Sequence, residues 1–328
     1  MFSKRIEFAQ RKFGPLFSRD SEAIFFNPGT PSHCLSLSLD ELVAYQTLFP
    51  VVDQLETAGI KCVQIISQCK FNLAVISIPK SKKLARHLIY LATKAVPEGL
   101  IIVDGNKSDG IESIIRDLEE KIKITNVISK AHGKTTWFET PADLEMYKDI
   151  PLKIEDGFET QAGVFSSDGV DPASKLLIEL LPRDLKGVGA DLGGGWGYLS
   201  AKALETNSIL ELHFIEADFT AMSLAKNNLN DKRLKFHWCD ALKWKAPKLL
   251  DFIIMNPPFH HLGRAIPTLG VDFIKVASRN LKKSGTLWMV ANRHLPYEDA
   301  IQRHFSSFSE LSRSKKFKVI RAENPINF

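Results

Sequence analysis

The sequence predicts an α/β protein with two domains, the second of which contains a mainly parallel β-sheet. Its 328 residues exceed the length at which a single hydrophobic core usually stops growing, so two domains are expected. From residue 187 onward, short apolar runs alternate with segments of helical periodicity, which is typical of βαβ units. The middle of the first half repeats part of this alternation, which indicates a related fold there.

Strand-like and helix-like segments can be placed along the second half. Strands are expected at 188–192, 211–215, 234–238, 251–255 and 285–290, with a final strand at 315–320. Residues 198–204 are helix-like, and the apolar residues within 221–229 follow the 3.6-residue period of a helix. Asp171 followed by Pro172 is a typical N-cap and first helical residue, so a helix is expected to include the apolar run 176–181.

Two segments of the first half resemble two segments of the second. Residues 72–80 parallel residues 251–259, because each segment has an apolar strand followed by a proline-containing turn. Residues 98–106 parallel residues 284–292 in the same way, and a helical pattern separates the two segments in each half. We interpret this as a duplicated domain, although two generic strand–helix–strand units would also look alike.

The first copy lacks the residues on which chemistry would depend. It has no glycine-rich turn, and Ser77 stands where the second copy has Asn256. We therefore expect it to bind no cofactor and to have a structural or substrate-gripping role. A basic run in its helix would suit substrate gripping, but a solvated helix face explains the same run equally well. The run consists of Lys80, Lys82, Lys83, Arg86 and His87.

The domain boundary is expected where periodicity is lost. Residues 134–158 carry prolines and charges without a clear repeat, which is typical of a linker. We expect a degenerate first domain over 1–140, a linker over 141–160 and a catalytic domain over 161–328.

The composition excludes several classes of protein. The chain is 44% hydrophobic and 25% charged, as in ordinary globular proteins. No stretch approaches about 18 consecutive apolar residues, and the N-terminus is charged, so we expect a cytoplasmic protein without a membrane segment. The 4 cysteines form no C-x-x-C pair, which favours free thiols over disulfides or a metal site. A net charge of +5 permits a nucleic-acid partner.

A glycine-rich turn at 191–197 follows the first strand of the second half and precedes a helix. Glycine allows the backbone to approach a ligand closely. The glycines are Gly193, Gly195 and Gly197, whereas a dinucleotide fingerprint would require glycine at the position of Tyr198. This spacing favours S-adenosylmethionine over NAD, with a purely structural tight turn as the alternative.

Acidic residues end three successive strands of the second half, namely Asp191, Glu216 and Asp240. Open α/β sheets bind ligands at the carboxyl ends of their strands, so these residues are expected at one site. Glu216 could accept hydrogen bonds from the two ribose hydroxyls of an adenosine moiety. Asp240 could accept from the adenine amino group while Ala241 flanks the ring. Each acid alone would be an ordinary strand-end residue.

Asn256, Pro257, Pro258 and Phe259 follow the strand at 251–255 and form the most specific motif of the chain. The two prolines fix the backbone and cannot donate hydrogen bonds, so the loop has stiff carbonyl groups that can accept. Asn256 Oδ1 and the Pro257 carbonyl can accept both N–H groups of a planar amine and relieve the positive charge that develops during methylation. Phe259 can stack on a base. A proline-rich turn after a buried strand is the alternative.

These features resemble the bacterial ribosomal RNA guanine-N2 methyltransferases of the RsmC/RlmG type. The resemblance spans residues 160–322 and rests on segments 163–171, 191–197, 256–260, 290–297 and 317–321. It implies two tandem Rossmann-like class I methyltransferase domains, of which the first is degenerate and the second has a seven-stranded, mostly parallel sheet. Two departures are Gly194, where many relatives have cysteine, and the bulky Trp196. Over the first domain the resemblance is faint.

The resemblance also implies roles for individual residues. S-adenosyl-L-methionine would be the cofactor and S-adenosyl-L-homocysteine its product, with no metal. The cofactor residues would be Asp191, Gly193, Gly195, Gly197, Glu216, Asp240 and Ala241, with Phe165, Asp171 and Asn256 close by. Asn256 with Pro257 would hold the amine.

The expected function is direct methyl transfer to the exocyclic N2 of a guanine in ribosomal RNA, most simply the 16S RNA of the small ribosomal subunit. A monomer is expected. Basic residues near the C-terminus would add phosphate affinity. They are Arg313, Lys315, Lys316, Lys318 and Arg321. Two alternatives stay open: methylation of adenine N6 or of a protein glutamine amide by the same site, or a non-catalytic RNA-binding scaffold.

Overall fold

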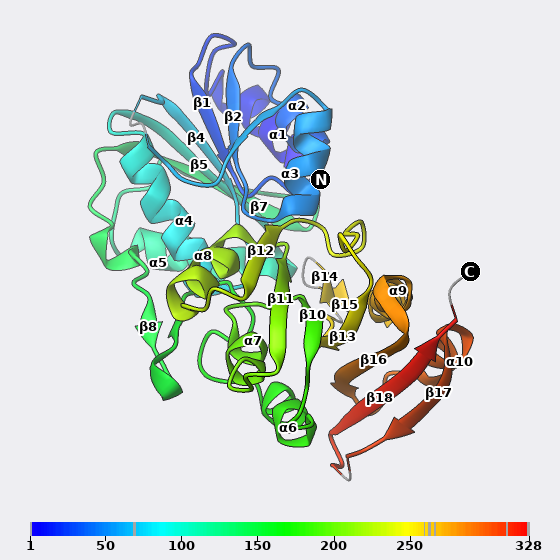
Figure 1. The fold of residues 1–328 in the computed structure, drawn as a ribbon. Helices are drawn as coiled ribbons and strands as arrows, with labels where there is room; N and C mark the ends of the chain where they lie inside the picture. The colour runs from blue at the N-terminus through cyan, green and yellow to red at the C-terminus, as the bar shows by residue number, and fades with distance from the viewer. Residues whose placement is uncertain are drawn as a thin grey trace. The chain divides into compact units, whose positions relative to one another are not determined.

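The chain forms two compact units, residues 1–150 and residues 151–328 (Figure 1). The computed structural model describes residues 2–67, 70–258, 260–261, 264–265, 267–312 and 314–326, and only the backbone at 260, 261, 264, 265 and 267. The division between the units falls inside the range 141–160 that was expected to link them. Each unit has its own hydrophobic cores and its own sheet, so each is described by itself.

The first unit has a seven-stranded sheet with the order β3-β2-β1-β4-β5-β7-β6. Its strands are β1 (Ala23–Phe26), β2 (Leu42–Tyr45), β3 (Lys61–Val63), β4 (Leu73–Ser77), β5 (Gly99–Asn106), β6 (Asn126–Lys130) and β7 (Gly133–Thr140). Only β7 runs antiparallel to its neighbours. Helices α4 (Lys82–Ala95) and α5 (Ile111–Glu119) cover one face. The other face packs against α1 (Phe2–Phe13), α2 (Pro31–Leu35) and α3 (Phe49–Thr57).

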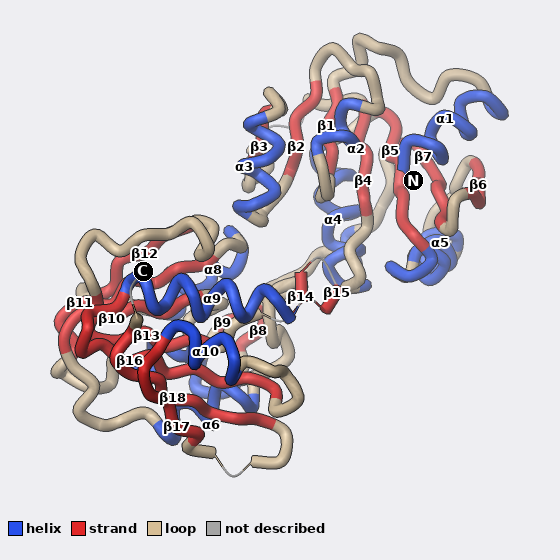
Figure 2. Tube along the Cα trace, turned by 90° about the vertical axis from the view of Figure 1, so that its right-hand side faces the viewer, coloured by secondary structure: helices blue, strands red, loops and turns tan. Residues whose placement is uncertain are grey.

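The second unit has a seven-stranded sheet with the order β12-β11-β10-β13-β16-β18-β17. Its strands are β10 (Gly187–Leu192), β11 (Ile209–Glu216), β12 (Leu234–Trp238), β13 (Leu250–Met255), β16 (Leu281–Asn292), β17 (Phe305–Glu310) and β18 (Phe317–Pro325). Helices α9 (Pro267–Asn280) and α10 (Glu298–His304) cover one face (Figure 2). The other face packs against α6 (Pro172–Leu180), α7 (Tyr198–Ala203) and α8 (Phe219–Asn228). Two short hairpins complete it, β8 (Leu152–Lys153) with β9 (Glu159–Thr160) and β14 (His260–His261) with β15 (Arg264–Ala265).

The two sheets share one topology, which confirms the expected pair of α/β domains. In both, the fourth and fifth strands of the order are those whose sequences match, β4 with β13 and β5 with β16. The sixth strand of each order, β7 or β18, is the antiparallel one. After the first strand, however, the first unit has Asn27 at φ 57°, where the second has Gly193 at φ 79°. The first unit therefore keeps a positive φ after its first strand, but its turn has a single glycine, Gly29, where the second unit has four.

The basic run of α4 is largely engaged in ion pairs within the first unit. Lys82 and Arg86 both pair with Asp117 of α5. Lys83 pairs with Asp149, whose side chain is only 2% exposed. These contacts hold α4 in place within the first unit. They favour the interpretation of this run as a solvated helix face and disfavour its interpretation as a substrate grip.

The C-terminal strands differ most from the expected elements. The final strand extends over Phe317–Pro325 instead of 315–320, and the expected strand at 285–290 lengthens to Leu281–Asn292. Strand β17 was not expected, because its two phenylalanines stand at 305 and 308, which is not the period of a strand. It nevertheless forms an edge strand, because it pairs with the long strand β18.

Close packing of two central strands sets the edge at which the site forms. Strand β10 runs parallel to β13, with Gly189 opposite Phe252 and Asp191 opposite Ile254. A Cβ at Gly189 would lie 2.2 Å from the Phe252 ring, so only glycine allows this approach. The parallel register brings the turn after β10 and the loop after β13 to the same edge of the sheet.

None of the helices in the described ranges is long and apolar enough to cross a membrane. The same part of the chain contains no group of three or more acidic, histidine or cysteine side chains that could hold a metal ion.

Candidate active site

The glycine-rich turn after β10 leaves open space in front of its backbone. Gly193, Gly195 and Gly197 have φ of 79°, 60° and 105°, the left-handed region that favours glycine. The amides of Gly193 and Gly194 both donate to the Ile215 carbonyl, at 2.9 and 3.0 Å, which fixes the turn against β11. A Cβ at Gly195 would meet no atom within 4 Å. The turn therefore presents bare backbone to a ligand at this position.

Glu216, the last residue of β11, lies beside this turn. Its Oε2 accepts from the Gly195 amide at 2.8 Å, and its Oε1 accepts from the Asp218 amide at 2.7 Å. A carboxylate has about four acceptor sites, so capacity is left for two hydroxyl groups. Burial raises the pKa of Glu216 to about 7, despite the two amides, and the charge of Asp218 adds to this effect.

Asp191 is fully buried beneath the turn. Its Oδ2 accepts from the Ser200 hydroxyl at 2.7 Å, whereas its Oδ1 has no hydrogen-bond partner among the described residues. Burial raises the pKa of Asp191 to about 7, and the nearby charge of Glu216 contributes. An ionised carboxylate without partners is costly in such a place, so this oxygen is an acceptor that a donor on a ligand or a water can satisfy.

Asn256 follows β13 and is held by the first turn of α6. Asp171 is the N-cap of that helix, as expected, because its Oδ2 accepts from the Ser174 amide at 2.8 Å. The same Oδ2 also accepts from Asn256 Nδ2 at 2.9 Å, and Ser174 Oγ accepts from Asn256 Nδ2 at 3.0 Å. Both N–H groups of the Asn256 amide are thus engaged, while its Oδ1 accepts no hydrogen bond from the described residues.

A pocket at this edge of the sheet brings several of the expected residues together. It is lined by Phe165, Ser166, Asp171, Ser174, Gly193, Gly194, Gly195, Trp196, Tyr198, Leu199 and Asn256. Phe165, which is 56% exposed, is the large apolar residue on its rim, and its carbonyl accepts from Trp196 Nε1 at 3.0 Å.

The other expected residues lie behind or beside this pocket. Gly197 backs onto Leu229, because a Cβ there would be 2.7 Å from Leu229 Cδ1. The neighbouring strand β12 leads to Asp240, whose Oδ1 accepts from the Leu242 amide at 2.9 Å, and to the buried Ala241.

The two prolines of the loop after β13 differ in exposure. Pro257 is buried, whereas Pro258 is exposed and would lie 3.9 Å from a Cβ at Gly193. The loop therefore runs beside the glycine turn. Phe259 lies outside the described residues, so its stacking role stays a prediction.

The model of the methyltransferase small domain family matches residues 155–321, a range that contains every site residue described above. The chain belongs to this family. It is 32% identical to the ribosomal RNA small subunit methyltransferase C of Shewanella loihica, over 80% of this chain and 81% of that protein. It is 29% identical to the ribosomal RNA large subunit methyltransferase G of Yersinia pestis, over 96% of this chain and 79% of that protein.

Among solved structures, the methyltransferase is similar to the T. thermophilus 16S rRNA N2 G1207 methyltransferase in complex with AdoMet and guanosine. The TM-score is 0.79 at 23% identity, and the match covers 97% of this chain and 91% of that one. The likeness extends over both units, so the pair of α/β domains is a fold that a known methyltransferase shares.

The residues present fit S-adenosylmethionine, the cofactor of this methyltransferase. The open space at Gly195 is a cradle that any side chain would fill. The spare acceptor capacity of Glu216 suits hydroxyl donors, and the unpartnered Asp191 Oδ1 suits a positively charged or N–H donor. These features do not require a metal ion.

Some pocket residues of the methyltransferase were missed by sequence reasoning. Ser174 is the most informative, because it lies one helical turn after Asp171 and contacts Asn256. Its position three residues after an N-cap was the available signal. Trp196 was noted only as bulky, yet it lines the pocket, and Asn228 of α8 holds its carbonyl at 2.9 Å.

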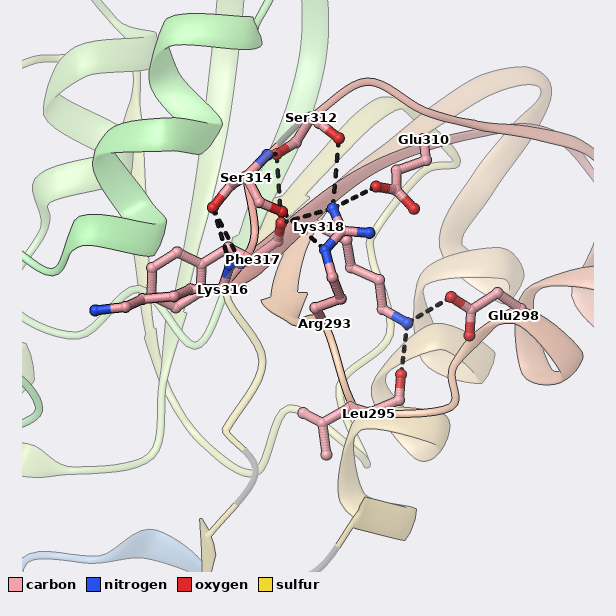
Figure 3. Close-up of polar contacts among 9 residues, drawn as sticks. All are labelled: Arg293, Leu295, Glu298, Glu310, Ser312, Ser314, Lys316, Phe317 and Lys318. Carbon is pink, nitrogen blue, oxygen red and sulfur yellow. Dashed lines mark hydrogen bonds and ion pairs between the residues drawn. The ribbon is translucent and has the colours of Figure 1, made fainter.

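The basic residues near the C-terminus of the methyltransferase do not all face solvent (Figure 3). Lys318 is 2% exposed, and its Nζ donates to the Leu295 carbonyl at 2.6 Å and pairs with Glu298. The expectation that Lys318 binds phosphate was therefore wrong, because a buried, paired ammonium holds the chain together instead. Arg321 pairs with Glu323 and lies over the Trp288 ring. Arg313 lies outside the described residues.

Lys315 and Lys316 are exposed, in the turn between β17 and β18. Arg293 fixes the shape of this turn, because its guanidinium donates to the carbonyls of Ser314 and Phe317 and pairs with Glu310 (Figure 3). Strand β18 begins opposite Asn292, the carboxyl end of β16, so this turn lies at the same sheet edge as the loop after β13.

Substitution of Lys318 by alanine is expected to lower stability by about 2–3 kcal/mol, because it removes a buried ammonium that pairs with the partly exposed Glu298 and leaves an unfilled space. Thermal or urea unfolding measures this loss. The control is the double variant Lys315→Ala/Lys316→Ala, which should unfold like the unaltered protein but reduce the salt dependence of RNA binding. Equal stability of the Lys318 variant and this control would show that Lys318 is not structural.

Proposed function

We propose that this methyltransferase transfers a methyl group to the exocyclic N2 of a guanine in ribosomal RNA. The observation that carries the proposal is the arrangement of Asn256, whose two N–H groups are used by Asp171 and Ser174. The acceptor Oδ1 is thus the part of the amide available to a substrate, in a pocket shared with the glycine turn. An acceptor at this point suits a substrate that donates N–H groups.

The chemistry explains why two acceptors are needed. The lone pair of an amine on an aromatic ring is delocalised, so the amine is a poor nucleophile. Asn256 Oδ1 and the Pro257 carbonyl each accept one of its N–H groups, orient the lone pair and stabilise the positive charge that forms on nitrogen. When bound, S-adenosylmethionine supplies an electrophilic methyl group. Gly195, Glu216, Asp191 and Asp240 hold it, and the protein needs no covalent intermediate of its own.

The relatives support RNA guanine as the substrate class. The names of the two relatives above give ribosomal RNA of the small and of the large subunit, and the solved structure is named for an N2 position. We infer a small-subunit RNA, because the small-subunit relative is the more similar of the two, at 32% against 29% identity. We further propose that the protein is a cytoplasmic monomer and that its first unit positions RNA without binding cofactor.

The test is methylation in vitro. Purified protein is incubated with isotopically labelled S-adenosylmethionine and ribosomal RNA or small subunits that lack the modification, and the RNA is digested to nucleosides for mass spectrometry. The expected product is N2-methylguanosine. Labelled N6-methyladenosine, or label found only in a protein glutamine, would replace the proposal by the corresponding alternative. No label in any acceptor, combined with no cofactor binding, would favour a scaffold.

Cofactor binding is expected to depend on pH. Burial raises the pKa values of Asp191 and Glu216 to about 7, from 3.8 and 4.5. A ligand that donates hydrogen bonds to these carboxylates favours their ionised form, so binding of S-adenosylhomocysteine should release protons near pH 7 and tighten from pH 6 to pH 8. Calorimetry in buffers of different ionisation enthalpy measures the proton release.

Without ligand, the same raised pKa values lower the stability of the folded protein as pH rises, whereas they tighten cofactor binding for the same direction of pH change. Between about pH 4 and pH 7 the folded protein holds more protons on these groups than the unfolded chain, so their contribution to stability falls as pH rises through that window.

The control for the binding experiment is Glu216→Gln, which should reduce the proton release on binding of S-adenosylhomocysteine. Binding that is independent of pH in both proteins would contradict this account of the cofactor acids.

A further inference from the structure

We propose that Asp171 and Ser174 are positioning residues that fix which end of the Asn256 amide faces the target amine. The inference rests on the role proposed above for Asn256 and adds the means by which its orientation is set. The relevant contacts join the N-terminus of α6 to the loop after β13, two segments that are 85 residues apart in the chain.

The chemistry of the contacts permits only one orientation of the amide. An ionised carboxylate accepts hydrogen bonds and cannot donate them, so the atom 2.9 Å from Asp171 Oδ2 has to be the nitrogen of Asn256. A half-turn of the amide would place Oδ1 there instead, with two acceptors in contact and neither bonded. Ser174 Oγ, at 3.0 Å from the same nitrogen, engages its second N–H group.

The helix holds both acceptors rigidly. Asp171 Oδ2 also accepts from the Ser174 amide at 2.8 Å, so the oxygen that orients Asn256 is fixed by the first turn of α6. That helix is anchored on the sheet through Ala173 and Leu177, both buried in the core. Ser174 itself is 6% exposed. The N-cap of α6 therefore has a second use besides starting the helix.

The orientation matters because an amide has two different ends. Turned over, Asn256 would present N–H donors to an amine whose own N–H groups are donors. It would then form no hydrogen bond with the amine and would oppose the positive charge that develops on it. The Asp171 carboxylate removes this unproductive state, and it acts only through Asn256.

The first variant that tests the proposal is Asp171→Gly. Glycine is tolerated at an N-cap with little loss of stability, so folding should be preserved. It has no side chain, however, and therefore no longer dictates the orientation of Asn256. We expect kcat on small-subunit ribosomal RNA to fall about 10- to 100-fold, with little change in KM, in melting temperature or in affinity for S-adenosylhomocysteine.

The matched control is Asp168→Gly, which removes the same side chain from an exposed residue three positions earlier that does not contact Asn256. It should retain the kcat of the unaltered protein. Ser174→Ala is a second, independent variant that removes one of the two acceptors, and a smaller loss of kcat is expected. A reduced kcat in both site variants at unchanged melting temperature distinguishes positioning from folding.

The decisive variant combines Asp171→Gly with Asn256→Asp. The new carboxylate at 256 presents an acceptor oxygen to the amine whichever way it faces, so it needs no partner to orient it. The combination should raise kcat at least about tenfold over Asp171→Gly alone. Asn256→Asp alone puts two carboxylates in contact, so one of them is expected to hold a proton, and its activity should follow a different pH profile from that of the doubly substituted protein.

The outcomes separate this inference from the proposed function. Full kcat in Asp171→Gly, or a doubly substituted protein no more active than Asp171→Gly, would overturn the positioning role even if Asn256→Ala is inactive. Undiminished turnover in Asn256→Ala would overturn the role of Asn256 itself.

Discussion

Replacement of Asn256 by alanine is expected to lower turnover on ribosomal RNA by a factor of about 100 or more, while binding of S-adenosylhomocysteine is retained. The variant loses the side-chain acceptor that holds the amine and stabilises its developing charge, and loss of one such group commonly costs a factor of about 100 to 1,000. Single-turnover methylation and calorimetry of the same preparation measure the two quantities.

A fold control accompanies this experiment, because Asn256 Nδ2 also bonds Asp171 and Ser174. The melting temperature of the variant should fall only slightly, since the helix cap between Asp171 and the Ser174 amide is retained. Turnover that matches the unaltered protein would remove Asn256 from the mechanism, and with it the main structural support for an amine substrate.

Replacement of Glu216 by alanine is expected to weaken cofactor binding by a factor of about 100. The carboxylate accepts from the Gly195 and Asp218 amides and is proposed to accept from the ribose hydroxyls as well. Its removal takes away the proposed ligand contacts and one of the hydrogen bonds that join the glycine turn to β11. Calorimetric titration with S-adenosylhomocysteine measures the change.

Glu211 provides the matched control for Glu216, because it lies on the same strand but near its opposite end, where its Oε1 lies 3.2 Å from His213 Nε2. Glu211→Ala should bind the cofactor product with unchanged affinity. If both variants bind equally well, Glu216 supports only the turn and the cofactor contacts lie elsewhere.

Those parts of the fold that depend on local patterns could be predicted from the sequence. The strand that ends at Leu192, the glycine turn and helix α7 are encoded in one continuous stretch, and Asp171 with Pro172 marks the start of α6. The shared edge of the site also followed, because parallel strands end at the same side of a sheet. The pairing of β10 with β13 then places Asn256 near the glycine turn.

Contacts between distant segments could not be predicted in this way. The local pattern indicates that Asp171 caps a helix, but nothing local indicates that its carboxylate also contacts a side chain 85 positions later. Lys318 looks like part of a basic tail, and only the strand pairing of β18 shows that its side chain turns inward to Leu295 and Glu298. Sequence gives charge, but burial and partners decide whether that charge is available to RNA.

Nucleoside mapping of ribosomal RNA from a strain that lacks this chain tests the central claim most directly. Complementation with the unaltered protein and with Asn256→Ala completes the experiment. We predict that one N2-methylguanosine disappears from small-subunit RNA in the deletion strain, returns with the unaltered protein and does not return with Asn256→Ala. Ribosomal RNA with an unchanged set of N2-methylguanosines in the deletion strain, or restoration by the alanine variant, would contradict the account.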